Sequence, residues 1–145
     1  MRIWDYRILP YLPELQFKGQ LRELVLIMRQ WRDTGKTNHL LINRVMEYHK
    51  EHLTTYFMEY SYIYHQRYGK SLKKYQHEFY DFCETAFYPL DNLFNGWHNK
   101  EYLRICMSNL AEKHFYGVGK SRISDEEWQR LVDGYRQITG EEYVI

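Results

Sequence analysis

The residues with the clearest chemical potential lie at the start of the chain and on the segment that follows it. The sequence begins with Met1 and Arg2, and Arg22 and Glu23 stand side by side about twenty residues later. An α-amine has a pKa of about 7.7–8, against about 10.4 for a lysine side chain, so far more of it is unprotonated at neutral pH. An anchored chain end would therefore offer a nucleophile, with a phosphate clamp and a carboxylate nearby. We expect no leader segment before Met1.

The same residues also allow a plainer interpretation. Ile3 and Trp4 are apolar, so they can dock the chain end without making it reactive. Arg22 and Glu23 can be a solvated pair on a helix surface, because chain ends and charged helix faces are usually inert. The residue types alone leave both interpretations open.

The element that must position Arg22 and Glu23 is a helix predicted over residues 14–33. Its apolar residues recur at helical spacing, which favours burial of one stripe. We expect the buried stripe to contain Phe17, Leu21, Leu24 and Met28. A basic ridge follows one flank, made of Lys18, Arg22 and Arg29, of which Lys18 and Arg29 should be exposed. Gly19 lies one turn before Glu23, so a partner could approach the helix backbone there.

The rest of the chain also has helical periodicity. Further helices are predicted over residues 38–68, with one break allowed in the first two turns, and over 71–87, 99–113 and 124–139. Ser124 and Glu127 have the spacing of a capping box, and Pro89 should stop the preceding helix. Residues 89–97 are predicted to be a loop. We therefore expect an all-α fold of about four to five helices in a single domain, residues 1–145.

Composition narrows the class of protein. The net charge of +1 argues against a uniformly basic nucleic-acid binder, but residues 15–50 hold seven basic and three acidic side chains. The aromatic share is 18%, with 15 tyrosines, which suit half-buried helix faces and wet binding surfaces.

Cys83 and Cys106 stand far apart in helical settings, so a disulfide framework is not expected. No apolar run approaches a membrane span. We expect a soluble, cytoplasmic monomer that binds no membrane.

Other chemistry-bearing patterns are weaker. His49 and His52 lie close to one helix face, but a metal site needs more ligands than two imidazoles. The run 117–121 (Gly-Val-Gly-Lys-Ser) resembles a phosphate-binding loop but lacks its spacing and the strand before it. We expect no metal and no cofactor.

The start of the chain and the Arg22-Glu23-Leu24 triplet resemble the phage-type pyrimidine-dimer DNA glycosylases. Those enzymes are small, all-helical and single-domain, and they use the N-terminal α-amine as nucleophile. The Met-Arg-Ile-Trp start, followed by Gln16-x-x-Gly19-x-x-Arg22-Glu23, is similar to a bacterial branch of that superfamily. The resemblance is strongest over residues 1–24 and extends in helical layout to about Gly69.

The resemblance implies a role for particular residues. Met1 would supply the catalytic amine and Glu23 the catalytic carboxylate. The protein's partner would be damaged double-stranded DNA. Its reaction would be that of a glycosylase and abasic-site lyase, which proceeds through an imine. The expected DNA contacts are Arg2, Lys18, Arg22, Arg29 and Arg44.

Two departures from the phage pattern matter. The phage enzymes start with threonine once methionine is removed, whereas the bulky Arg2 here should disfavour removal and keep Met1. The phage helix has an arginine one turn past the glutamate, where this chain has Leu26, and Arg29 could substitute from the next turn. Residues 114–120 are a loose counterpart of the phage enzymes' aromatic and basic DNA-contacting segment. The alternatives are a non-catalytic helical module that binds nucleic acid, or a protein-interaction domain.

Overall fold

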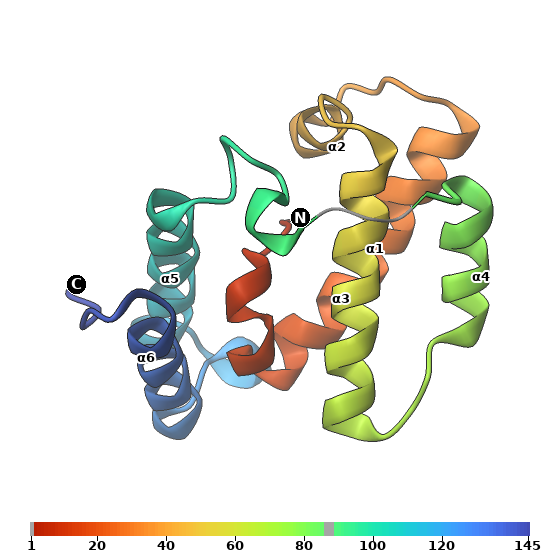
Figure 1. The fold of residues 1–145 in the computed structure, drawn as a ribbon. Coiled ribbons are helices and arrows are strands. Elements are labelled where there is room, and N and C mark those ends of the chain that lie inside the picture. The colour runs from red at the N-terminus through yellow and green to blue at the C-terminus, as the bar shows by residue number, and fades with distance from the viewer. Residues whose placement is uncertain (1, 86–88) are drawn as a thin grey trace. The chain divides into compact units, whose positions relative to one another are not determined.

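The computed structural model describes residues 2–85 and 89–145, and the regular elements in these ranges are all helices (Figure 1). No strand occurs in them, which confirms the all-α prediction. The α-helices are α1 (Glu14–Asp33), α2 (Leu40–Val45), α3 (Lys50–Tyr68), α4 (Lys73–Phe82), α5 (Lys100–Phe115) and α6 (Asp125–Thr139). The described residues also form three short 3₁₀ helices: η1 (Tyr6–Tyr11) before α1, η2 (Leu90–Asn92) between α4 and α5, and η3 (Gly119–Ser121) between α5 and α6.

The chain groups into two compact units. The first contains residues 1–3 and 20–95, and the second contains residues 4–19 and 96–145. Helix α1 contributes its first turns to the second unit and the remainder to the first. The prediction of one domain over residues 1–145 stays a prediction.

The first unit is built on aromatic packing between α1, α3 and α4. Phe57 of α3 stacks on Phe79 of α4 with ring centroids 4.0 Å apart. Trp31 of α1 meets Phe82 of α4 edge to face at 5.5 Å. Helix α4 runs beside α3 after the turn at Gly69 (Figure 1). Such aromatic pairs prefer offset or edge-on contact and add to the area they bury. They fix the helices that surround the candidate site.

The expected break in the predicted helix 38–68 is confirmed. Helix α2 ends at Val45, and α3 begins after His49, whose backbone is extended (ψ 148°). The His49 ring nitrogen Nδ1 accepts a hydrogen bond from the Glu51 amide at 3.2 Å, so the side chain caps α3. A cap of this kind satisfies an amide that has no partner within the helix. At its other end α3 stops at Gly69, which takes the left-handed conformation (φ 68°).

The prediction that a helix runs from 71 to 87 is wrong at its end. Helix α4 stops at Phe82, and Cys83 is extended. The chain that follows makes a tertiary bond instead, because the Thr85 hydroxyl donates to Glu51 Oε1 of α3 at 2.7 Å. The remainder of the predicted helix and Tyr88, that is residues 86–88, lies outside the described residues.

Residues 89–97 form the expected loop, with η2 within it, and side chains of α3 and of the segment just before α3 bond its backbone. The Phe94 amide donates to Nδ1 of His52 at 2.9 Å, and the Tyr48 hydroxyl donates to the Asn95 carbonyl at 2.7 Å. Phe94 adopts a positive φ of 50°, which is uncommon for a bulky residue. Burial lowers the pKa of His52, so its ring stays neutral and keeps the acceptor that Phe94 needs.

The second unit packs η1 against α6, and α5 beside α6 (Figure 1). Gly134 of α6 is required there, because a Cβ atom at that position would meet the Tyr11 ring at 2.4 Å. The predicted capping box is confirmed: Ser124 accepts from the Glu127 amide at 3.1 Å, and Glu127 Oε1 accepts from the Ser124 amide at 3.0 Å. Helix α6 then begins at Asp125.

Helix α1 begins and ends where it was predicted, and most of its expected burial is confirmed. Phe17, Leu24 and Met28 are fully buried, while the Lys18 and Arg29 side chains are 50% and 45% exposed. Leu21 is an exception, since it is only partly buried. It lines a surface cavity that is described with the candidate site.

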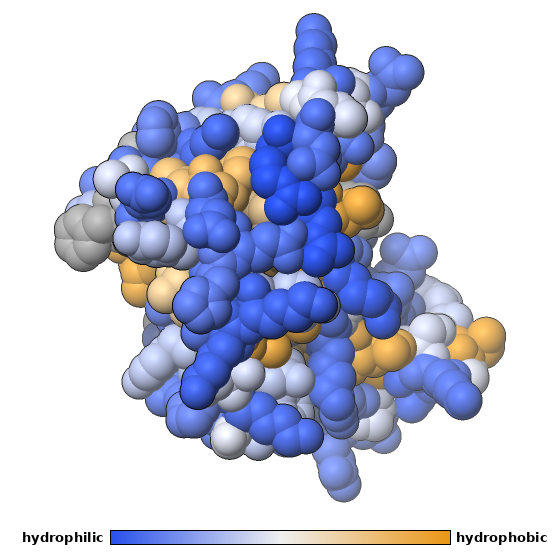
Figure 2. Space-filling model, turned by 90° about the vertical axis from the view of Figure 1, so that its right-hand side faces the viewer, coloured by the Kyte–Doolittle hydropathy of each residue, from blue (hydrophilic) through white to orange (hydrophobic). Residues whose placement is uncertain are grey.

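Figure 2 shows a face where hydrophilic residues prevail and apolar atoms form small, separate patches. Among the described residues, no helix has both the length and the apolar character needed to cross a membrane.

Candidate functional site

The candidate site is built around the main chain of Arg2, which two side chains of α1 hold. The Arg2 amide nitrogen donates to Glu23 Oε2 at 3.0 Å. Gln20 Nε2 donates to the Arg2 carbonyl at 2.8 Å and also to Glu23 Oε2 at 3.2 Å. Both polar groups of the Arg2 peptide backbone are thus engaged. The three residues belong to the same unit of the structure.

A buried tyrosine completes this arrangement from α3. The Tyr56 hydroxyl donates to Gln20 Oε1 at 3.2 Å, and both Tyr56 and Gln20 are 0% exposed. Glu23 is only half-buried. Ile3 and Trp4, the expected anchors of the chain end, are 0% and 6% exposed, which confirms their burial. The site therefore has a rigid, buried side and a carboxylate that remains accessible to a ligand.

Met1, the predicted nucleophile, lies outside the described residues, and its predicted closeness to Glu23 stays a prediction. In any peptide, the α-amine of the first residue is three covalent bonds from the amide nitrogen of the second. Here that second nitrogen, of Arg2, is bonded to the Glu23 carboxylate. The arrangement can therefore keep a carboxylate close to the start of the chain.

Arg22 lies on the exposed side of α1, next to Glu23. It contributes to the wall of a cavity of about 390 Å³ together with Arg29 and a tyrosine of α4. The full lining is Leu21, Arg22, Val25, Leu26, Arg29 and Tyr75. The wall of this cavity therefore combines two arginines with apolar and aromatic side chains.

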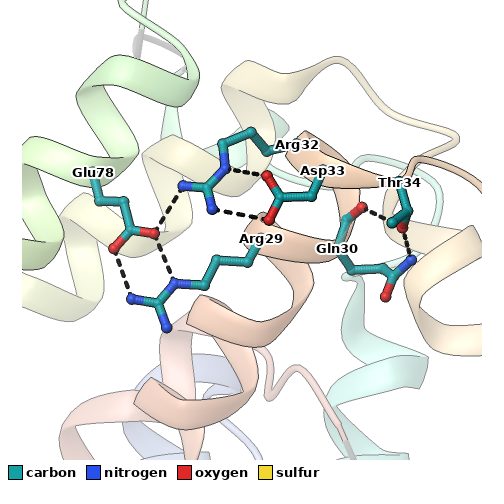
Figure 3. A network of polar contacts seen from close by, with 6 residues as sticks. All are labelled: Arg29, Gln30, Arg32, Asp33, Thr34 and Glu78. Atoms are coloured by element: carbon teal, nitrogen blue, oxygen red, sulfur yellow. Dashed lines mark hydrogen bonds and ion pairs between the residues drawn. The ribbon is translucent and has the colours of Figure 1, made fainter.

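Arg29 is committed to an ion-pair network that ties α1 to α4 (Figure 3). Its guanidinium donates to both carboxylate oxygens of Glu78, at 2.7 and 2.9 Å. Arg32 donates to the same Glu78 at 2.9 Å and pairs with Asp33. These bonds from Arg29, and then Arg32, lower the pKa of Glu78 to about 2. Gln30 and Thr34 are bonded to each other on the adjacent turn.

The remaining predicted DNA contacts also carry acidic neighbours. Lys18 pairs with Glu14 at 2.7 Å, and Arg44 pairs with Glu47. The Arg44 guanidinium also lies over the Tyr48 ring, 5.6 Å from its centroid. Exposed pairs of this kind contribute little to stability, so they can be exchanged for another anion. The expected contacts of these basic residues with DNA stay a prediction.

His49 and His52, the two histidines considered as metal ligands, each accept a hydrogen bond from a backbone amide. His49 Nδ1 caps α3, and His52 Nδ1 accepts from Phe94. Within residues 2–85 and 89–145, no three or more potential metal-binding side chains come together.

The sequence interpretation assigned no role to Gln20, Tyr56 or Glu78. Gln20 lies one helical turn before Glu23, and that i, i+3 spacing could have identified it as a neighbour of the carboxylate. Tyr56 is one of 15 tyrosines, which the composition as a whole places on half-buried helix faces or wet binding surfaces. Its bond to Gln20 and the bonds of Glu78 to α1 join residues distant in sequence, so no local pattern could reveal them.

The candidate site is thus a helical scaffold that holds the Arg2 main chain against the carboxylate of Glu23. The comparison with protein families then names the family. Residues 1–76, just over half of the chain, match the family model of pyrimidine dimer DNA glycosylase, and the chain belongs to that family. No match was found among curated proteins or among solved structures.

The matched range covers the whole candidate site. It contains η1, α1, α2 and α3 and ends within the first half of α4. Arg2, Gln20, Glu23 and Tyr56 fall inside it, as do all the predicted DNA contacts. The α5–α6 region lies beyond it.

Proposed function

We propose that this protein is a DNA glycosylase with abasic-site lyase activity that acts on damaged duplex DNA through the N-terminal α-amine. The observation that carries the proposal is the hydrogen bond from the Arg2 amide to the Glu23 carboxylate. It holds the second residue of the chain against the carboxylate that the family resemblance assigns to catalysis. Family membership over residues 1–76 supports the same class of substrate.

The proposed reaction starts from the neutral amine. Its lone pair attacks the sugar carbon C1′, the glycosidic bond to the damaged base breaks, and the base leaves with the bonding electrons and takes up a proton. The sugar ring then opens as its oxygen gains a proton and a C1′=N imine forms. Loss of a proton from C2′ then breaks the C3′–O bond and expels the phosphate, which cuts the strand. Glu23 would stabilise the developing positive charge and carry protons between these steps.

DNA would be held mainly through phosphate contacts by arginines. Arg22 is exposed beside Glu23 and lines the cavity described above. Arg29 already donates through Nε and Nη2 to Glu78, so its charge is largely neutralised before any phosphate arrives. A damaged base pair stacks poorly, so distorting the duplex there costs less than at a normal pair.

Arg22→Ala should therefore weaken DNA binding more than Arg29→Ala. Binding to a duplex with one abasic site, measured over a salt series, should lose about one unit of log–log slope in Arg22→Ala. In Arg29→Ala the slope should change less, because that side chain is already neutralised by Glu78. Equal losses of slope in the two variants would contradict the assignment of Arg22 as the leading contact.

The proposed function is tested by trapping the imine. The full chain with a free N-terminus is mixed with abasic-site DNA and borohydride, which reduces an imine to a stable amine. We expect one covalent protein–DNA adduct, and strand cleavage when borohydride is omitted. Binding without an adduct would favour a non-catalytic nucleic-acid module, and absence of DNA binding at low salt would favour a protein-interaction domain.

A further inference from the structure

We propose that Gln20 and Tyr56 are positioning residues that set the start of the chain and Glu23 in reacting geometry. The inference rests on the proposed function, because it concerns the same site. Neither residue is expected to touch DNA, since both are fully buried. They would act through Arg2 and Glu23.

Gln20 has the bonding capacity that this task needs. Its amide group supplies two N–H donors and one carbonyl acceptor. One Nε2 contact goes to the Arg2 carbonyl and another to Glu23 Oε2, at 2.8 and 3.2 Å. A single buried side chain thereby joins the chain end to the carboxylate. An aliphatic side chain of the same size could make neither contact.

The Arg2 carbonyl and the Glu23 carboxylate can only accept, so they determine which way the Gln20 amide faces, and Tyr56 holds the carbonyl side of that amide. Its hydroxyl donates to Gln20 Oε1 at 3.2 Å, so the carbonyl oxygen is directed to α3 and the NH₂ group to Arg2 and Glu23. With the amide reversed, the Gln20 carbonyl oxygen would face both the Arg2 carbonyl and the Glu23 carboxylate, three acceptors with no donor between them. Buried polar groups left without partners are costly, so the observed orientation is strongly favoured.

This geometry matters for rate because the nucleophile and its carboxylate must be placed together. A displacement of about 1 Å in a reacting group can lower a rate by about 100-fold. The Arg2 amide contact to Glu23 and the Arg2 carbonyl contact to Gln20 restrain the peptide at both ends. Without Gln20, only the first of these contacts remains.

The experiment measures single-turnover trapping on abasic-site DNA in wild type, Gln20→Leu and Tyr56→Phe. We expect the rate constant to fall at least about 10-fold in Gln20→Leu, and by less in Tyr56→Phe, with the final adduct yield and DNA affinity unchanged. The matched control is Tyr60→Phe, since Tyr60 is equally buried one turn further along α3, where its ring lies 6.2 Å from that of Tyr64. It should keep the wild-type rate.

The outcomes separate this inference from the proposed function. A lower yield at an unchanged rate constant would mean that Gln20 only supports folding, and the inference would be overturned. Equal rates in all four proteins would overturn it while leaving the proposed function intact. A wild-type protein that forms no adduct would overturn the proposed function, and the positioning role with it.

A second measurement does not depend on activity. Amide hydrogen exchange at Arg2, followed by NMR, should be slow in wild type and in Tyr60→Phe, because the Arg2 N–H is bonded to Glu23. It should accelerate in Gln20→Leu. Equal protection of the Arg2 amide in wild type and Gln20→Leu would overturn the positioning role.

Discussion

Blocking the N-terminal amine should abolish both adduct trapping and strand cleavage. Acetylation, or an N-terminal tag left in place, removes the lone pair that would attack C1′. DNA affinity should persist, because Arg22 and the other basic side chains are untouched. Residues added before Met1 would also have to fit beside the Glu23 carboxylate, because the Arg2 amide is bonded to it. The measurement is the yield of borohydride-trapped adduct beside a binding isotherm on the same duplex.

The matched control is the same tag placed at the C-terminus with the N-terminus free, which should trap and cleave normally. Treating the N-terminally tagged protein with a protease that restores Met1 as the first residue should recover activity. If the blocked protein cleaves as fast as the free one, an internal lysine performs the chemistry and the assignment of the amine is wrong.

The helical fold was largely predictable because its signals are local. The bounds of α1 and the capping box at the start of α6 follow from apolar periodicity and from the Ser124–Glu127 spacing. The end of α4 was not predictable, because the contact between Thr85 and Glu51 depends on how α3 and α4 pack. Side-chain propensity alone favours continuing that helix as far as Pro89.

The candidate site was predictable in its parts but not in its connections. Residue types and family resemblance pointed to Glu23, Arg2 and Arg22, and the structure brings Arg2 and Glu23 into contact. The link through Gln20 to Tyr56 spans 36 residues, and the bond from Arg29 to Glu78 spans 49. Contacts at such separations arise only from tertiary packing, so a single sequence carries no local sign of them.

The ion pairs of Glu78 reduce the positive charge that the basic residues of α1 present to DNA. Arg29 and Arg32 are exposed cations, yet Glu78 and Asp33 neutralise them locally. A count of positive side chains on α1 therefore overstates the field available to attract DNA. Arg22, beside the Glu23 carboxylate, has the stronger claim to a phosphate contact because of its place at the site rather than its charge alone.

Glu23→Gln should sharply reduce turnover while leaving the fold and DNA binding intact. The amide oxygen of glutamine can still accept from the Arg2 amide and from Gln20, so the chain end should keep its place. The negative charge is lost, and with it the stabilisation of positive charge and the transfer of protons, a contribution of about 10²–10⁴-fold in rate. Affinity for DNA should stay equal or rise, because a carboxylate near phosphates is repulsive.

Single-turnover cleavage, a binding isotherm and a thermal melt on the same preparation measure the rate, the DNA affinity and the stability of the fold. Glu23→Ala is the comparison variant that lacks the acceptor as well. If Glu23→Gln melts like an unfolded chain, Glu23 is a structural partner of Arg2 rather than a catalytic carboxylate. If it folds and cleaves at the wild-type rate, the proton transfers must run through another group.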